Sequence, residues 1–253
     1  MNSCRPGNAK LVVQNLRKDF ADIPVIADVS LTLNEGEFVS LIGLSGSGKS
    51  TIFNIISGLL LPDRGEVLIN GENYTGITGR VSYMYQKDLL LPWKNIIDNV
   101  CLPLVIKGEK LKRAREIARG YFKLFGLEGF EYKYPFQLSG GMRQRAALMR
   151  TFFFSKDIML LDEPFGGLDA ITRARMQTWL LEVLANLNSA VLLITHDIEE
   201  AIYLSDRIYI ISDRPARIRE EIRVAYPKPR DIGLVTSESF NELKKQLLQY
   251  LQF

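Results

Sequence analysis

The feature that most limits how this chain can fold is a glycine-rich segment, residues 43–50, with the sequence GLSGSGKS. It matches the pattern G-x-x-x-x-G-K-[ST], which lies between a strand and a helix in proteins that bind nucleotide phosphates. The apolar run 38–42 precedes it, and residues 49–59 follow with apolar side chains at helical spacing. The segment therefore predicts a nucleotide-binding turn, and a glycine-rich turn that binds nothing is the alternative.

The residue types in this turn suit phosphate chemistry. Glycines allow successive backbone N–H groups to point inward, and the following helix adds the positive end of its dipole. We expect Lys49 to reach the β- and γ-phosphates of ATP and the Ser50 hydroxyl to coordinate Mg²⁺. The other residues expected to contact the nucleotide here are Gly43, Ser45, Gly46, Ser47, Gly48 and Thr51.

A second apolar run, residues 158–161, ends in two acids, Asp162 and Glu163. This is the Walker B pattern. Asp162 is expected to hold Mg²⁺ directly or through water, and Glu163 to take a proton from the attacking water. A solvated strand end is the alternative.

The order of apolar runs predicts a mainly parallel sheet covered by helices. Residues 170–187 are expected to form a crossover helix between strands 158–161 and 191–194. A helical block is expected from about residue 93 to 154, and apolar side chains recur within it at helical spacing: Leu111, Ala114, Ala118, Tyr121 and Phe125. Further strands are expected at 29–33, 65–69, 81–85, 208–211 and 218–224, and a closing helix carries Phe240, Leu243, Leu247 and Leu251.

Composition excludes several classes. The 253 residues suit one large domain or a core with an inserted subdomain. A net charge of +3 is too weak to argue for nucleic acid, and Cys4 and Cys101 make no disulfide framework. We expect neither a signal peptide nor a membrane helix, because no apolar run approaches the roughly 20 residues that a membrane helix needs. Work at a membrane would then require docking on another protein.

Residues 138–145, LSGGMRQR, contain a serine and two glycines at the expected start of a helix. Ser139 and the backbone of Gly140 and Gly141 can donate to a phosphate there, and an ordinary helix cap is the alternative. L-S-G-G-x-x-x-R shortly before a carboxylate strand resembles the signature of the ABC transporter ATPases. The resemblance runs from about residue 11 to 213.

The resemblance implies an α/β fold: a P-loop NTPase (RecA-like) with a mainly parallel core sheet, an antiparallel β subdomain and an inserted α-helical subdomain. One ABC ATPase domain would span residues 1–253. Within it, 1–86 and 156–215 would form the nucleotide-binding core, 87–155 the helical subdomain, and 216–253 a C-terminal strand and helix.

The resemblance also implies roles for residues outside the first two motifs. Gln86 is similar to the glutamine that links Mg²⁺ to the helical block, and Asp169 to the D-loop aspartate. His196, the sole histidine, is similar to the switch histidine that contacts the γ-phosphate. Phe20 is similar to the aromatic residue that stacks on adenine, with core packing as its alternative. Glu163, His196 and Gln86 would thus be catalytic.

In this family the signature of one subunit completes the ATP site of the other. The expected partners are therefore a second copy of this chain, two transmembrane permease subunits and, indirectly, an extracytoplasmic solute-binding protein, with no nucleic acid. The expected location is peripheral, on the cytoplasmic face of the inner membrane. ATP binding would close the dimer, and hydrolysis would reopen it to drive uptake of a small solute.

Residues 85–93 and 162–166 resemble the nitrate, sulfonate and taurine importer subgroup, which usually has Ala where this chain has Gly167. Vitamin precursors are also open as solutes. Leu89, Leu90, Leu91 and Trp93 are expected to form a socket for a permease helix, with packing inside the subdomain as the alternative. The basic residues between 214 and 230 are expected to lie on a solvated strand face, with headgroup or nucleic-acid contact as the alternative.

Two other functions compete with transport. A soluble ABC protein acting on DNA or ribosomes usually carries two cassettes or a long coiled coil, and this chain has neither. A scaffold that binds ATP without turnover would not need both Glu163 and His196.

Overall fold

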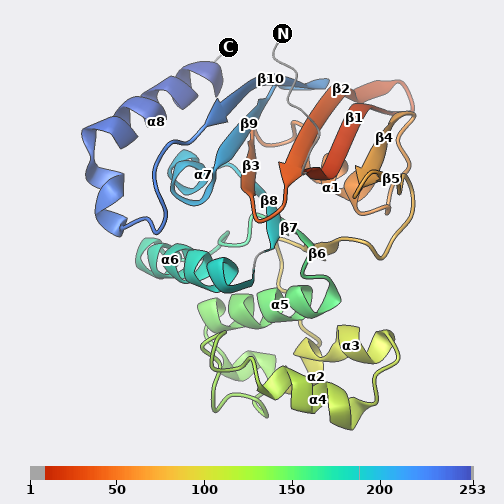
Figure 1. Ribbon diagram of the computed structural model, residues 1–253, viewed down its shortest axis with the longest axis vertical. Helices are drawn as coiled ribbons and strands as arrows, with labels where there is room; N and C mark the ends of the chain where they lie inside the picture. Colours follow the sequence, from red (N-terminus) through yellow and green to blue (C-terminus); the bar gives the residue numbers. More distant parts are fainter. Residues whose placement is uncertain (1–8, 188, 252–253) are drawn as a thin grey trace.

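The computed structural model describes residues 9–187 and 189–251 of the chain. Cys4 lies outside these ranges. The described strands form one sheet in the order β5-β4-β1-β2-β10-β9-β3-β8-β7-β6 (Figure 1). The strands are β1 Ala9–Phe20, β2 Ile23–Asn34, β3 Phe38–Ile42, β4 Arg64–Ile69, β5 Glu72–Asn73, β6 Ser82–Met84, β7 Ile158–Asp162, β8 Ala190–Thr195, β9 Arg207–Ile211 and β10 Ala216–Arg223.

Helices cover this sheet and extend from one side of it. They are α1 Lys49–Ile56, α2 Ile96–Val100, α3 Leu102–Ile106, α4 Leu111–Arg119, α5 Gly140–Phe154, α6 Ala170–Leu187, α7 Ile198–Leu204 and α8 Glu238–Leu251. None of the helices in the described part of the chain has the length and apolar character that crossing a bilayer requires.

One half of the sheet is parallel. β3 pairs in parallel with β8 and β9, and β7 pairs in parallel with β8 and β6. Parallel neighbours end at the same edge of a sheet, so the loops that follow these strands gather there. The loop after β3 is the glycine-rich turn, and the loop after β7 begins at Glu163.

The parallel strands are buried on both faces, as their continuous apolar sequences require. Alternate side chains enter two different cores, because successive residues of a strand point to opposite faces. On β3, Phe38 and Ile42 enter the core beneath α5, α6 and α7, whereas Val39 and Leu41 enter the core shared with α1, β1 and β2. This packing fixes the register in which the strands deliver their loops.

The other half of the sheet is antiparallel. β1 pairs with β2 and with β4 in antiparallel register. β10 connects the two halves, because it pairs in parallel with β2 and in antiparallel register with β9. The sheet is therefore mixed, with helices on its faces, and the expected fold class is confirmed. Phe20, at the end of β1, is 44% exposed, so it does not pack in a core.

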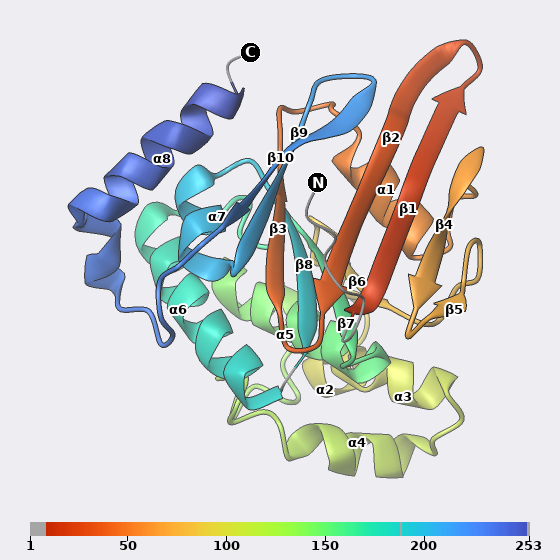
Figure 2. The ribbon, with the colours of Figure 1, turned by 45° about the horizontal axis from the view of Figure 1, so that its top comes forward.

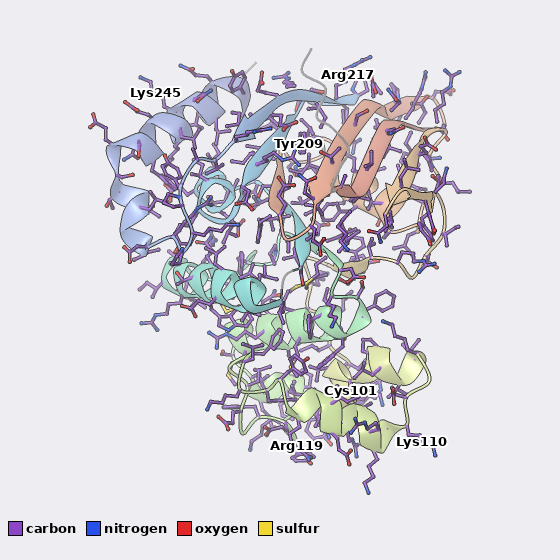
Figure 3. The ribbon with its side chains drawn as sticks, viewed as in Figure 1. Cys101, Lys110, Arg119, Tyr209, Arg217 and Lys245 are labelled. Carbon is purple, nitrogen blue, oxygen red and sulfur yellow. The ribbon has the colours of Figure 1, made fainter. Side chains whose placement is uncertain are left out.

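In the helical block, α2, α3 and α4 lie farther from the sheet, and α5 lies between them and the sheet, packing against β6 (Figures 1 and 2). Cys101 is buried within this block (Figure 3). α4 ends at Arg119, before Gly120, so Tyr121 and Phe125 do not continue its helical spacing but pack from the turns beyond it. The domain boundaries expected from the sequence stay a prediction.

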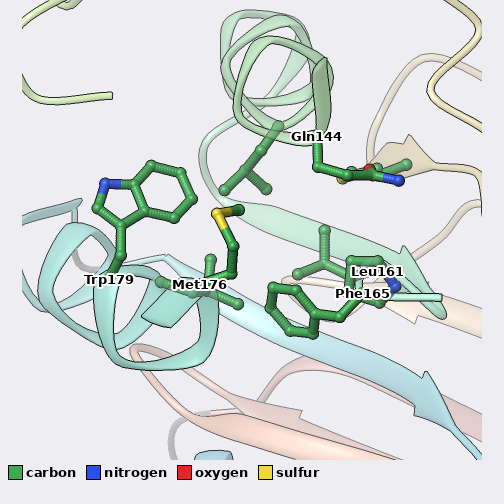
Figure 4. A pocket seen from close by; sticks show the side chains of 9 residues that line it. Gln144, Leu161, Phe165, Met176 and Trp179 are labelled. Atoms are coloured by element: carbon green, nitrogen blue, oxygen red, sulfur yellow. The ribbon is translucent and has the colours of Figure 1, made fainter. Parts of the chain in front are cut away.

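α5 and α6 meet at an apolar junction that also contains the segment after β7. Figure 4 shows Met176 between Trp179 and Phe165, with Gln144 of α5 above them. The free space is about 10 Å³, hardly room for one water, so the junction is closely packed. The Arg145 guanidinium lies 4.9 Å from the centre of the Trp179 ring. The start of α5 is thereby held relative to the end of β7.

Several local expectations were wrong. α1 ends at Ile56 and not near Leu59, because Gly58 takes a left-handed conformation (φ 77°) and closes the helix. In the expected socket, Leu90 is buried in the core shared by α2, α5 and the sheet, whereas Leu89 and Trp93 are exposed. In the basic segment, which was expected to be solvated, Arg230 is buried.

Glu200 on α7 is a buried carboxyl near the end of β8. It is 4% exposed, and it accepts a hydrogen bond from the Thr195 hydroxyl. The pKa of Glu200 is raised to about 7, chiefly because of burial. The charge of Asp197 contributes to this rise, while hydrogen bonds from Thr195 and Gln177 and the charge of Arg173 oppose it. The native protein therefore holds a proton on Glu200 that the unfolded chain releases near its ordinary pKa of 4.5.

Glu200→Gln is expected to remove a pH dependence of stability. The contribution of the Glu200 proton is full below the unfolded pKa and is lost as the pH rises through the folded pKa. Relative to the variant, the wild-type free energy of unfolding should fall by at most about 3 kcal/mol between about pH 5 and pH 8. Urea unfolding at both pH values measures this, with Glu199→Gln as the exposed control. A constant difference between wild type and Glu200→Gln would contradict the buried, proton-holding carboxyl.

Candidate functional site

A cavity of about 300 Å³ opens at the edge where the parallel strands end. Loops that follow β3, β6, β7 and β9, together with the end of β8, contribute its walls. The residues that line it are Ser45, Gly46, Gly48, Lys49, Ser50, Thr51, Gln86, Asp162, Glu163, Ile194 and Arg214. Most of the residues expected in the phosphate turn thus share one space with the two acids.

The turn folds around the Lys49 ammonium. Lys49 Nζ donates to the carbonyl oxygens of Gly43 and Leu44, each at 2.8 Å, and lies 3.4 Å from Ser47 Oγ. Burial lowers the pKa of Lys49, while the nearby charges of Glu163 and Asp162 raise it. A cation fixed in this way can neutralise a phosphate without first being ordered.

Two glycines of the turn have backbone conformations that other residues rarely adopt. Gly48, at the start of α1, has φ 103°, and Gly46 has φ 80°. A Cβ on Gly48 would lie 3.3 Å from the carbonyl oxygen of Val25, whereas one on Gly46 would meet nothing within 4 Å. Gly46 therefore leaves the cavity side open, and Gly48 lets the turn pack against β2.

Asp162 lies at the end of β7 and is 8% exposed. Burial raises its pKa, and hydrogen bonds from the Ser50 hydroxyl and from Tyr83 lower it. The Tyr83 hydroxyl donates to Asp162 Oδ2 at 3.2 Å. Burial and the Asp162 charge raise the pKa of Tyr83, so the phenol stays protonated and can donate.

Glu163 is held from two sides at the mouth of the cavity. Gln86 Nε2 donates to Glu163 Oε2 at 2.9 Å, and His196 Nδ1 lies 3.0 Å from Glu163 Oε1. The Glu163 backbone has φ 45°, an uncommon value for a residue with a side chain, and its N–H bonds to Ile194 O at 2.9 Å. Such a conformation persists only where its surroundings enforce it. Three predicted catalytic residues therefore meet at one carboxylate.

The donor set around Asp162 fits Mg²⁺ bound together with a nucleotide. It offers hard oxygen ligands, the Asp162 carboxylate and the Ser50 hydroxyl, in hydrogen-bond contact. Among the described residues, no group of three or more His, Cys, Asp or Glu side chains could hold a metal alone. Mg²⁺ usually takes one or two carboxylates and completes its shell with phosphate oxygens and water.

Gly43, Ser47 and His196 do not line the cavity but contact Lys49 or Glu163, which do. Five other residues expected at the nucleotide lie away from it in the single chain. Ser139 caps α5, accepting from Met142 N at 3.3 Å, and Gly140 and Gly141 follow it. Asp169 Oδ1 accepts from Thr172 N at 3.0 Å at the start of α6. Phe20 lies at the end of β1. None of these is among the described residues that line the cavity.

The site also includes residues that the sequence analysis missed. Ile194 and Arg214 line the cavity, and Tyr83 reaches it only through its hydrogen bond to Asp162. Tyr83 lies within an expected strand and Ile194 ends another, but their place at the site depends on which strands are neighbours. Arg214 was grouped with a basic segment expected to be solvated. No local sequence pattern around Arg214 could have indicated its place at the site. Its loop reaches the cavity because β9 runs parallel to β3 and lies beside it.

Comparison with known proteins gives the family. The family model described as ABC transporter matches residues 26–166. The chain is 46% identical over 226 residues to the formylaminopyrimidine import ATP-binding protein ThiZ of Halalkalibacterium halodurans, covering 88% of this chain and 87% of that one. It is 39% identical over 235 residues to the taurine import ATP-binding protein TauB of Escherichia coli O157:H7, covering 92% and 90%.

A solved structure agrees with these relatives. The dimeric ATP-binding cassette MJ0796, in a post-hydrolysis state bound to ADP and Pi, superposes with a TM-score of 0.73 at 30% identity. The match covers 86% of this chain and 100% of that one. The phosphate turn and the signature segment occur here in the order that the sequence resemblance required. The chain therefore belongs to the family of ABC transporter ATP-binding proteins, and it is an ATPase.

Proposed function

We propose that this chain is the ATP-hydrolysing subunit of an importer for a small solute, and that two copies close head to tail over two nucleotides. The observation that carries the proposal is that the residues expected around one nucleotide lie at two separate places on the chain. Lys49, Asp162 and Glu163 share one open cavity, whereas Ser139 lies elsewhere, exposed at the start of α5. The start of α5 in a second copy can supply to this cavity the hydrogen-bond donors that lie away from it in the single chain.

The start of α5 suits this role. The first N–H groups of a helix have no partner within the helix, and the dipole favours an anion there. Gly141 is packed so closely on α6 that a Cβ would lie 3.3 Å from Thr172 Cγ2. Gly141 thus lets α5 approach α6 closely, and Gly140, which is partly exposed, leaves the backbone of this helix end bare for a phosphate of the partner's nucleotide. Closure would also exclude water and strengthen the charge interactions inside.

Hydrolysis needs a base beside the γ-phosphate, and Glu163 is the group placed for it. Its carboxylate accepts a proton as a water oxygen attacks the γ-phosphorus and the bond to the bridging oxygen of ADP breaks. Gln86 and His196 orient the two carboxylate oxygens, while Lys49 holds the phosphates. Mg²⁺, bound with the nucleotide by Ser50 and Asp162, would neutralise developing charge.

A second groove, of about 420 Å³, suits a permease helix. It is mostly apolar and lies between the sheet and the helical subdomain. Its lining includes Tyr83, Tyr85, Leu89, Leu102 and Ile106. Tyr83 also donates to Asp162, so one strand, β6, contributes to both the groove and the ATP site.

The path from the site to this groove is short. Gln86 bonds to Glu163, and two residues later the carbonyl of Asp88 accepts from Arg150 of α5 at 2.6 Å. Arg150 also donates to Leu89 O at 2.7 Å and lines the groove. A shift of Gln86 during closure would therefore move the groove and α5 together.

The solute would be selected by the partner subunits and not by this chain. The relatives import formylaminopyrimidine or taurine by their names, so a small polar or anionic solute is the class we propose. The subunit would then lie peripherally on the cytoplasmic face of the membrane, beneath two permease subunits.

Glu163→Gln is expected to slow ATP hydrolysis by roughly 10²–10⁴, because the amide cannot accept the proton. Nucleotide binding should persist, so the variant should accumulate as an ATP-bound dimer in size-exclusion chromatography with light scattering. Glu128→Gln, at an exposed turn, is the matched control and should behave as wild type. Near-normal turnover in Glu163→Gln would refute the assigned base.

Asp162→Asn is expected to separate nucleotide binding from metal use. Without its carboxylate, the site should lose most of the increase in turnover that Mg²⁺ gives, a loss of roughly 100-fold or more. Titration of turnover against Mg²⁺ at fixed ATP measures this. Asp157→Asn, at an exposed position just before β7, is the control. An unchanged Mg²⁺ dependence in Asp162→Asn would rule out Asp162 as a ligand.

A further inference from the structure

The loop between β9 and β10 lies against the phosphate turn. β9 is the parallel neighbour of β3, so its carboxyl end faces the same edge of the sheet. A Cβ on Gly43 would lie 2.6 Å from Ile211 Cγ1, and a Cβ on Gly48 would lie 3.7 Å from Ala216 Cβ. The two ends of the loop are therefore in contact range of the two ends of the turn.

This loop is held in one shape. Ser212 N donates to Arg217 O at 2.9 Å, and Arg217 N donates to Ser212 Oγ at 3.0 Å. Ser212 Oγ also donates to Pro215 O at 3.2 Å. Ala216 then pairs with Ile26 of β2. The residue at the tip, Arg214, is thus carried on a braced turn and lines the nucleotide cavity.

The guanidinium of Arg214 is not paired with another group of the described chain. Within the described residues, nothing accepts a hydrogen bond from its guanidinium or pairs with its charge, and the side chain is exposed. Three other cations of the same basic segment are occupied. Arg219 donates to Tyr250 O at 3.2 Å, Lys228 pairs with Asp206 at 2.7 Å, and Arg230 donates to Ile202 O at 3.0 Å. The exposed Arg217 and Arg223 also have no side-chain partner among the described residues, but they do not line the cavity.

A bound triphosphate would leave the cavity with an excess of negative charge, which a second cation would reduce. The charged groups that line it are Lys49, Arg214, Asp162 and Glu163. A bound triphosphate would add several negative charges, and Lys49 is already held by the carbonyls of its own turn. Arginine presents a planar fork of donors that matches two phosphate oxygens.

We propose that Arg214 binds the phosphate chain of the nucleotide in the cavity of its own chain, as a second cation beside Lys49. It sets nucleotide affinity and not the rate of the chemical step, because Glu163, Gln86 and His196 supply the base and its orientation. The inference rests on the proposed phosphate site.

The test measures equilibrium binding of ATP, ADP and adenosine to the full chain without Mg²⁺, by calorimetry. Arg214→Ala is expected to weaken ATP and ADP binding by about tenfold, since a charged hydrogen bond is lost, and to leave adenosine binding unchanged. Arg214→Lys should recover part of the loss. At saturating ATP, kcat should stay within about threefold of wild type, so the effect appears in KM.

Arg217→Ala is the matched control, because it removes the same charge from an exposed position three residues away. Figure 3 places Arg217 on β10 near β2, and it is not among the described residues that line the cavity. Its ATP and ADP affinities should equal those of wild type, and thermal unfolding of both variants should match.

Two outcomes would overturn the inference. One is ATP and ADP binding to Arg214→Ala within about twofold of Arg217→Ala, a difference too small for a phosphate hydrogen bond. The other is an equal loss for adenosine, which would place Arg214 on the nucleoside. Lys49→Ala shows whether such a result concerns Arg214 alone or the whole phosphate site. If Lys49→Ala and Arg214→Ala both bind ATP as wild type does, the assigned phosphate site is wrong. If only Lys49→Ala loses ATP affinity, the site stands and the role of Arg214 is rejected.

Discussion

The site depends on the parallel pairing of β9, β3, β8, β7 and β6. Because these neighbours run in one direction, their following loops meet at a single edge, and each loop contributes at least one polar group there. The phosphate turn, Gln86, Glu163, His196 and Arg214 come from five different connections. A reversal of any one strand would carry its loop to the opposite end of the sheet. The buried apolar faces that enforce this pairing are therefore as necessary to the chemistry as the polar residues themselves.

The cavity is electrostatically prepared for a ligand. Burial works against the charges of both Lys49 and Asp162, since it lowers the pKa of the amine and raises that of the acid. Their mutual attraction, together with hydrogen bonds from Ser50 and Tyr83, offsets part of this cost. Glu163, nearer the mouth, is held by Gln86 and His196 at its two carboxylate oxygens and faces the cavity as the candidate base. The arrangement separates one carboxylate suited to a metal from one suited to a proton, although the two are adjacent in sequence.

Sequence alone predicted the parts of this picture that local spacing determines. Residues 43–51, Asp162 and Glu163 could be found because strand, turn and helix are contiguous, and α6 was predicted with its observed ends. What sequence could not supply is the order of strands. Tyr83 reaches Asp162, and Arg214 reaches the phosphate turn, only because β6 lies next to β7 and β9 next to β3. The end of α4 and the burial of Leu90 were missed for a related reason, since turns and subdomain packing decided them.

The central claim is that one catalytic centre is built from two chains, and mixing two inactive variants tests it most directly. Lys49→Ala lacks the phosphate turn's cation, and Ser139→Arg blocks the helix end offered to the partner, so neither homodimer has an intact site. A randomly paired equal mixture should regain about a quarter of the wild-type sites, because half of the dimers are mixed and each has one complete site. ATP turnover by the mixture well above the mean of the two variants is the expected result. Turnover no greater than that mean would contradict a site shared between chains.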